Sequence, residues 1–145
     1  MNETQVNDMD EPINLVLFSG TDDRLNAATV LAAGAVALGR PVNIFLQYWA
    51  LDAFRADRIR DDHGLAPEAG PRGRAAVDAH RAASPITWVD TLRQVKELGG
   101  LDIQACSLSM DLLGISQSDL DPLVDGIEGV TAFYLNAGNG PVTFI

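Results

Sequence analysis

The hydrophobic period of the chain changes twice near its start, and this alternation limits the possible folds most strongly. Residues 13–18 form a nearly continuous apolar run, which is typical of a strand buried on both faces of a parallel sheet. Residues 25–38 carry apolar side chains at helical spacing, and Gly39 follows them as a helix-ending residue. Residues 41–46 form a second apolar run. A strand, a helix and a strand with such short connections predict a right-handed parallel crossover.

The rest of the chain continues this alternation. A helix is expected over residues 87–98, where Trp88, Leu92 and Val95 form one stripe before Gly99-Gly100. Further helical stretches are expected over 48–58, 107–113, 119–125 and 131–137, and further strands over 101–105, 127–130 and 141–145. The pattern predicts an α/β protein, a three-layer α/β/α sandwich with a parallel sheet of four or five strands.

The length of 145 residues fits one domain. We expect a single domain over 13–145, preceded by a flexible acidic tail over 1–12, where acidic residues crowd a stretch without periodicity. Residues 59–85 lose the pattern among several glycines and prolines. They are expected to form a long irregular insertion that is either mobile or a lid over a site.

Composition excludes several classes of function. Twenty acidic residues against ten basic ones give a net charge of −10, so neither nucleic acid nor an anionic membrane surface is an expected partner. The chain has no apolar run long enough to span a bilayer and no basic, apolar signal at its start. We therefore expect a cytoplasmic protein. Its single cysteine, Cys106, can form neither an internal disulfide nor a multi-thiolate metal site, and His63 and His80 are expected to be solvated, so no metal is expected.

Functional residues of a parallel α/β sheet gather where the strands end at their carboxyl termini. Three such ends are Ser19-Gly20, Tyr48-Trp49 and Cys106-Ser107. A flavin or nucleotide phosphate is not expected at the first end, because Asp22 and Asp23 place negative charge there, and we expect no cofactor.

Cys106 directly precedes an expected helical turn, whose free N–H groups favour a thiolate. Ser107 and Ser109 carry hydroxyls that can donate to the sulfur, and Tyr48 and Trp49 can wall a pocket over it. Asp111 would raise the pKa of the thiol if it faced the sulfur, but we expect it to cap the turn instead. The alternative for Cys106 is a small, buried and unreactive apolar residue.

Three motifs together resemble the DsrE/DsrF-like family: Phe18-Ser19-Gly20, the stretch 47–51, and above all the stretch 105–115. The last contains a Cys-x-x-Ser-Met-Asp signature, which here is Cys106, Ser109, Met110 and Asp111. The resemblance covers about residues 13–58 and 86–145. It implies an α/β sandwich that forms homotrimers or hexamers, and a sulfur carrier with a persulfide on Cys106.

The expected function is therefore a sulfur carrier, similar to a sulfurtransferase, that relays sulfane sulfur between the thiols of a donor and an acceptor protein. Two alternatives stay open. In the first alternative, the chain is an oligomeric scaffold that binds a small ligand around Ser19, Trp49 and Cys106 without turnover. In the second, it is a redox sensor whose thiol is oxidised.

Overall fold

The structure is a computed structural model and describes residues 10–145. Its strands are β1 (Ile13–Leu17), β2 (Val42–Leu46), β3 (Leu101–Cys106), β4 (Gly126–Glu128) and β5 (Val142–Phe144). Its helices are α2 (Asp22–Ala37), α3 (Tyr48–Ala53), α4 (Gly70–Ala83), α5 (Trp88–Leu98), α6 (Ser107–Leu113) and α7 (Val130–Ala137), with short 3-10 turns η1 (Pro67–Ala69) and η2 (Gln117–Asp119).

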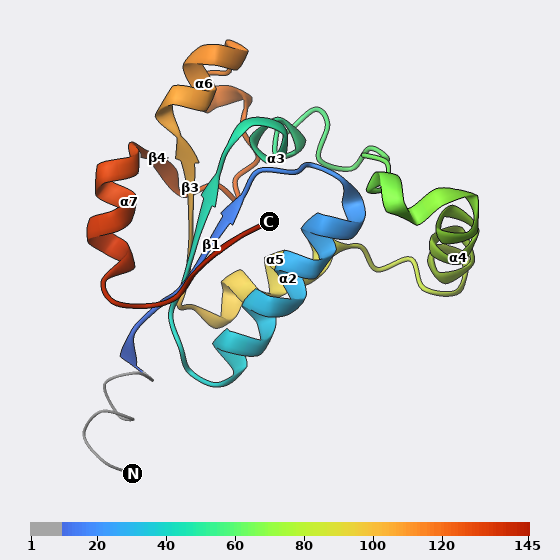
Figure 1. Cartoon of the computed structure of the whole chain (residues 1–145), viewed down its shortest axis with the longest axis horizontal. Helices are drawn as coiled ribbons and strands as arrows, with labels where there is room; N and C mark the ends of the chain where they lie inside the picture. The colour runs from blue at the N-terminus through green and yellow to red at the C-terminus, as the bar shows by residue number, and fades with distance from the viewer. Residues whose placement is uncertain (1–9) are drawn as a thin grey trace.

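The five strands pair in parallel in the order β4-β3-β2-β1-β5. Helices α2 and α5 cover one face of the sheet and α7 covers the other (Figure 1). Helices α3 and α6 follow β2 and β3 directly and lie at the carboxyl edge of the sheet. The predicted three-layer α/β/α sandwich is confirmed, with five strands.

The two faces of the sheet carry cores of unequal size, because alternate residues of a strand point to opposite sides. The larger core, next to α2 and α5, contains Leu15, Ile44 and Ile103, which are paired across β1, β2 and β3. The smaller core lies under α7 and has only four buried members, namely Val16, Phe45, Cys106 and Phe133. The single cysteine therefore belongs to the thinly covered face.

Residues 59–85 are not irregular throughout, which corrects the sequence-based expectation. Helix α4 occupies residues 70–83. Gly70, Pro71 and Gly73 all fall in its first turn, where a proline breaks no helical hydrogen bond, and the residues that follow are mostly alanine and arginine, which favour helix. No residue of α4 is buried, and the helix projects from the body of the protein (Figure 1).

The helix expected over residues 119–125 is also wrong. The chain forms only the turn η2 there. Pro122 disfavours a helical conformation of Asp121, the residue before it. The carboxylate of Asp121 also accepts a hydrogen bond from the Leu123 N–H at 2.9 Å, and such local bonds compete with helix formation.

The acidic tail expected over residues 1–12 lies mostly outside the described residues, which begin at residue 10. Glu11 is held by the body of the protein, because its carboxylate accepts a hydrogen bond from the Asn139 N–H at 3.0 Å. Among the helices of residues 10–145, none has the length and apolar character that crossing a bilayer requires.

Candidate functional site

Cys106 is the last residue of β3 and the residue directly before α6. Its side chain is only 5% exposed and packs with Val16, Phe45 and Phe133. The rings of Phe45 and Phe133 are stacked with their centroids 4.9 Å apart. The position at a strand end agrees with the sequence-based expectation, but the side chain is buried in a small cluster to which α7 contributes Phe133.

The hydroxyl of Ser109 has a backbone partner instead of the sulfur. Ser109 is fully buried, and its Oγ accepts a hydrogen bond from the Tyr48 N–H at 3.1 Å. Met110 belongs to the larger core on the opposite side of the sheet. Asp111 is exposed in the second half of α6, and no side chain caps that helix, so the expectation that Asp111 caps the turn is wrong.

Tyr48 adopts a left-handed backbone conformation, with φ of 44°. A residue other than glycine rarely adopts this conformation, and such strain costs on the order of 1–3 kcal/mol. The hydrogen bond that the Tyr48 N–H donates to Ser109 Oγ and the packing of the Tyr48 ring on Phe18, with centroids 5.1 Å apart, offset this cost. Tyr48 and Ser109, both predicted from the sequence as site residues, are therefore coupled through the backbone of α3.

Ser19, Gly20 and Trp49 meet at a second position of the carboxyl edge. A Cβ atom on Gly20 would lie 2.3 Å from the carbonyl oxygen of Trp49, so only glycine allows this approach. These residues line a cavity of about 350 Å³ together with Thr21, Asp52, Ala53, Arg58, Asp62 and His63. Cys106 does not line this cavity, so the structure assembles three of the predicted pocket residues without the sulfur.

Glu128 on β4 is a neighbour of Cys106 that the sequence analysis missed. The two residues are paired in register across β3 and β4, so their side chains start on the same face of the sheet. Burial raises the pKa of the Glu128 carboxyl above its ordinary value of 4.5, and the negative charge of Asp102 adds to this effect. Asn136 of α7 donates a hydrogen bond to the Glu128 carboxylate at 3.2 Å. No sequence pattern indicated this carboxyl, because it lies in a strand of three residues.

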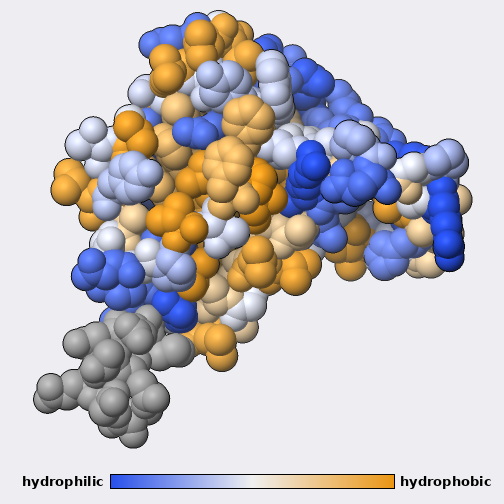
Figure 2. Space-filling view, in the orientation of Figure 1, coloured by the Kyte–Doolittle hydropathy of each residue, from blue (hydrophilic) through white to orange (hydrophobic). Residues whose placement is uncertain are grey.

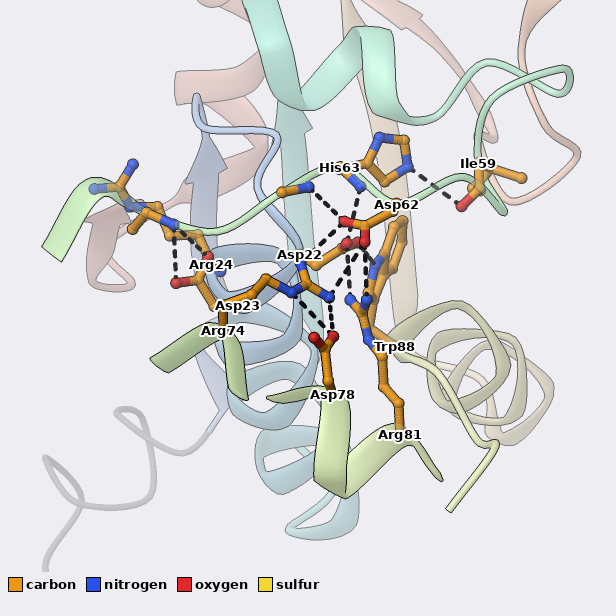
Figure 3. Close-up of polar contacts among 12 residues, drawn as sticks. Asp22, Asp23, Arg24, Ile59, Asp62, His63, Arg74, Asp78, Arg81 and Trp88 are labelled. Atoms are coloured by element: carbon orange, nitrogen blue, oxygen red, sulfur yellow. Dashed lines mark hydrogen bonds and ion pairs between the residues drawn. The ribbon is translucent and has the colours of Figure 1, made fainter. Parts of the chain in front are cut away.

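Asp22, in the first turn of α2, organises a second polar region (Figure 3). Its buried carboxylate accepts hydrogen bonds from the Trp88 Nε1–H at 3.0 Å and from the His63 N–H and Arg81 Nη2–H at 2.9 Å each. Arg81 belongs to α4, and it also pairs with Asp62 at 3.4 Å. These contacts attach α4, which buries no residue of its own, to the sheet-bearing body.

The space between α4 and the body is a cavity of about 550 Å³. Its apolar lining comes from Ile59, Val77, Ile86, Trp88 and three further residues, and its polar lining includes four carboxylates. The volume lies within the range of small-molecule sites. No sequence pattern indicated this cavity, because it depends on the position of a helix in a stretch where none was expected.

No group of three His, Cys, Asp or Glu side chains that could hold a metal ion occurs within residues 10–145. Of the two histidines expected to be solvated, His80 is exposed and His63 is half-buried. The His63 ring lies against Trp88, with centroids 6.4 Å apart.

Part of this chain is similar to a known protein family. Residues 9–70, which include β1, α2, β2 and α3, match the DsrE/DsrF/DrsH-like family. The matched range ends before Cys106, so the cysteine signature stays a prediction. An uncharacterized protein of Bacillus subtilis, YrkE, is 28% identical over 149 residues, and the match covers 88% of this chain and 92% of YrkE.

Two solved structures share the fold. One is MTH1491 of Methanobacterium thermoautotrophicum, a protein of unknown function, with a TM-score of 0.57 and 12% identity over 94% of this chain and 100% of that chain. The other is the ychN protein of E. coli, with a TM-score of 0.55 and 15% identity over 92% of this chain and 99% of that chain. By the family match over residues 9–70 and the α/β sandwich of the described residues, this chain is similar to DsrE/DsrF-like proteins.

Proposed function

We propose that the chain is a sulfur carrier that holds sulfane sulfur on Cys106 and passes it between the thiols of two partners. The observation that carries the proposal is the position of Cys106 at the carboxyl end of β3, a central strand of a DsrE/DsrF-like sheet. Reactive groups gather at this edge of parallel sheets. Because the chain has one cysteine, sulfur must enter and leave through the same atom.

The relay consists of two exchange steps without net oxidation. The Cys106 thiolate attacks the outer sulfur of a donor persulfide, R–S–SH, and forms a new S–S bond while the donor's own S–S bond breaks. The donor leaves as the thiolate RS⁻, and Cys106 carries the persulfide. An acceptor thiolate then attacks the outer sulfur of that persulfide, which releases Cys106 as a thiolate. No metal or redox cofactor takes part in either step.

Access to the sulfur requires a local opening, because Cys106 is 5% exposed, and α7 contributes Phe133 to the cluster in which Cys106 is buried. The end of α7 near Ala137 is tied to the sheet: Asn14 donates a hydrogen bond to the Ala137 carbonyl at 3.1 Å, and Asn43 donates one to the Asn136 carbonyl at 3.2 Å. The start of α7 has no side-chain cap. We therefore propose that the first turns of α7 lift while its end stays attached.

The test is to incubate the purified protein with a low-molecular-weight persulfide and to measure the intact mass. The carrier is supported if the protein gains the mass of one sulfur atom and an added thiol removes it. The Cys106→Ser variant should show no such gain. The absence of this adduct under conditions that load a known carrier would overturn the proposal. The protein whose persulfide loads Cys106 is then identified as the donor, and the protein whose thiol removes the sulfur is identified as the acceptor.

A ligand-binding module without turnover is the second candidate, favoured by the two cavities that Cys106 does not line. Ligand binding that survives Cys106→Ser, together with no sulfur loading, distinguishes it. A redox sensor would need the same opening of α7 as the carrier, because Cys106 is 5% exposed; a thiol that is oxidised but takes up no sulfur distinguishes it. A homo-oligomer, trimeric or hexameric, is proposed from the family resemblance.

A further inference from the structure

The cavity between α4 and the body of the protein has an apolar lining that is only partly buried. Trp88 and Val89 belong to this lining and to the larger core, and they are 5% and 1% exposed. Ile86 and Val77 also line the cavity, but Ile86 is 61% exposed and Val77 is half-buried. An apolar molecule inside the cavity would therefore remove apolar surface from water, and this transfer is favourable.

Helix α4 forms one wall of this cavity without packing into a core. None of its residues is buried, and hydrophilic side chains make up much of the projecting part of the molecule on the right of Figure 2. Arg81 ties the helix to the body through ion pairs with Asp22 at 2.9 Å and Asp62 at 3.4 Å (Figure 3). Val77 precedes Arg81 by one helical turn, so both side chains lie on the same face of α4. A molecule that packs on Val77 would supply the apolar contact with the body that α4 lacks.

The polar lining of the cavity is predominantly acidic. Besides His80, its ionisable side chains are four carboxylates and two guanidinium groups, namely those of Asp22, Asp23, Asp61, Asp62, Arg60 and Arg81. Both guanidinium groups have acidic partners, since Arg60 pairs with Asp90 at 2.9 Å and Arg81 pairs with Asp22. An anionic ligand would therefore meet an excess of negative charge and would compete with carboxylates of the protein for either arginine.

Two of these carboxylates, on Asp23 and Asp61, have no cationic partner in the part of the chain that the structure describes. The Asp23 carboxylate accepts a hydrogen bond from the Ala66 N–H at 3.1 Å, and Asp61 is exposed. Burial raises the pKa of Asp23, but hydrogen bonds from Thr21 and from backbone N–H groups lower it overall. This carboxylate therefore carries its charge at neutral pH.

We propose that this cavity binds a small organic amine, with its apolar body against the apolar lining and its ammonium group against the carboxylates of Asp23 and Asp61. An ammonium group only donates hydrogen bonds, and its bonds to carboxylates are among the stronger ones in proteins. The volume of about 550 Å³ accommodates a molecule of the size of an aromatic amine. The site does not depend on the sulfur chemistry proposed above, because Cys106 does not line the cavity.

The experiment compares three probes of similar shape by isothermal titration calorimetry on the full chain. Tryptamine carries an ammonium group, tryptophol is neutral, and indole-3-propionate is an anion. We expect tryptamine to bind at one site per chain and about tenfold more tightly than tryptophol, and indole-3-propionate to bind more weakly than either. The proposal is overturned if tryptamine shows no saturable binding, or if either of the other probes binds as tightly as tryptamine.

Three variants locate the site. Asp23→Asn and Asp61→Asn each remove one charge from the lining. Each should weaken tryptamine binding by about threefold to tenfold and leave the affinity for tryptophol unchanged. Val77→Asn replaces an apolar contact that both probes share, so it should weaken the binding of tryptamine and tryptophol together.

Asp57→Asn is the matched control, because Asp57 is 70% exposed and does not line the cavity. It removes the same charge from the chain and should leave the affinities of all three probes unchanged. Tryptamine binding that neither Asp23→Asn nor Asp61→Asn weakens would overturn the proposal. Equal weakening in Asp57→Asn would also overturn it, because the net charge of the chain, and not the lining of the cavity, would then determine the affinity.

Discussion

The burial of Phe133 and Cys106 in one small cluster makes a quantitative prediction for Phe133→Leu. Phe133 is 2% exposed and stacks on Phe45 with a centroid distance of 4.9 Å. The smaller side chain loses the aromatic pair and some packing volume, which together cost about 1–2 kcal/mol. If this cost destabilises the closed form relative to the form in which α7 is lifted, the population of molecules with an accessible thiol rises by a factor of about ten. This follows because about 1.4 kcal/mol corresponds to a factor of ten in an equilibrium constant.

The assay is the rate at which native Cys106 reacts with an aromatic disulfide reagent. We expect Phe133→Leu to accelerate the reaction roughly tenfold. Phe54→Leu is the matched control. Phe54 is 1% exposed and packs on Trp88 with the ring centroids 5.3 Å apart. Unlike Phe133, it lies in the larger core on the other face of the sheet. Equal acceleration in both variants would mean that the thiol reacts only after global unfolding, which would refute local opening of α7.

Three further predictions concern stability. Burial raises the pKa of Glu128, so ionisation of this carboxyl opposes folding, and the free energy of unfolding falls as the pH rises above 4.5. In urea unfolding, Glu128→Gln should therefore be more stable than the unmodified chain at neutral pH and should show no gain below pH 4. The Thr87 N–H donates to the Asp90 carboxylate and lowers its pKa, so the ionised carboxylate stabilises the fold. Asp90→Asn should therefore lower the free energy of unfolding by about 0.3–1 kcal/mol at neutral pH. Thermal melts should show this difference vanish as the pH falls below 3.8. Gly20→Ala places a Cβ atom 2.3 Å from the Trp49 carbonyl and should lower the free energy of unfolding by about 1–3 kcal/mol; an unchanged melting temperature would contradict this reasoning.

The sheet and the helices that cover it followed from the sequence because their apolar periods are unbroken. Residues 13–18 and 41–46 differ from residues 25–38 in period, and period is what separates a buried strand from an amphipathic helix. Helix α4 was missed because its glycines and proline suggested a loop. These residues fall in the first turn, a position where they do not interrupt a helix.

The candidate site was predictable in its positions but not in its contacts. The strand-end position of Cys106 depends on local sequence, and it was predicted correctly. Phe45 and Phe133, which are buried in the same cluster as Cys106, come from distant parts of the chain, and no local pattern shows that they meet. The same holds for Asp22 and Arg81, which are joined only because α4 folds back toward α2.

Burial of Cys106 is compatible with a carrier if the carried group needs protection. A persulfide exchanges with any thiol that can reach its outer sulfur, and small thiols are abundant wherever thiols are kept reduced. A sulfur atom that stood free at the sheet edge would lose its cargo to them. In the proposed relay, α7, which contributes Phe133 to the cluster around Cys106 and stays attached at its Asn136 end, would restrict exchange to the open molecules. Transfer to a partner protein would then depend on contacts that hold α7 open, so selectivity would reside in this helix and not in the nucleophilicity of the thiol.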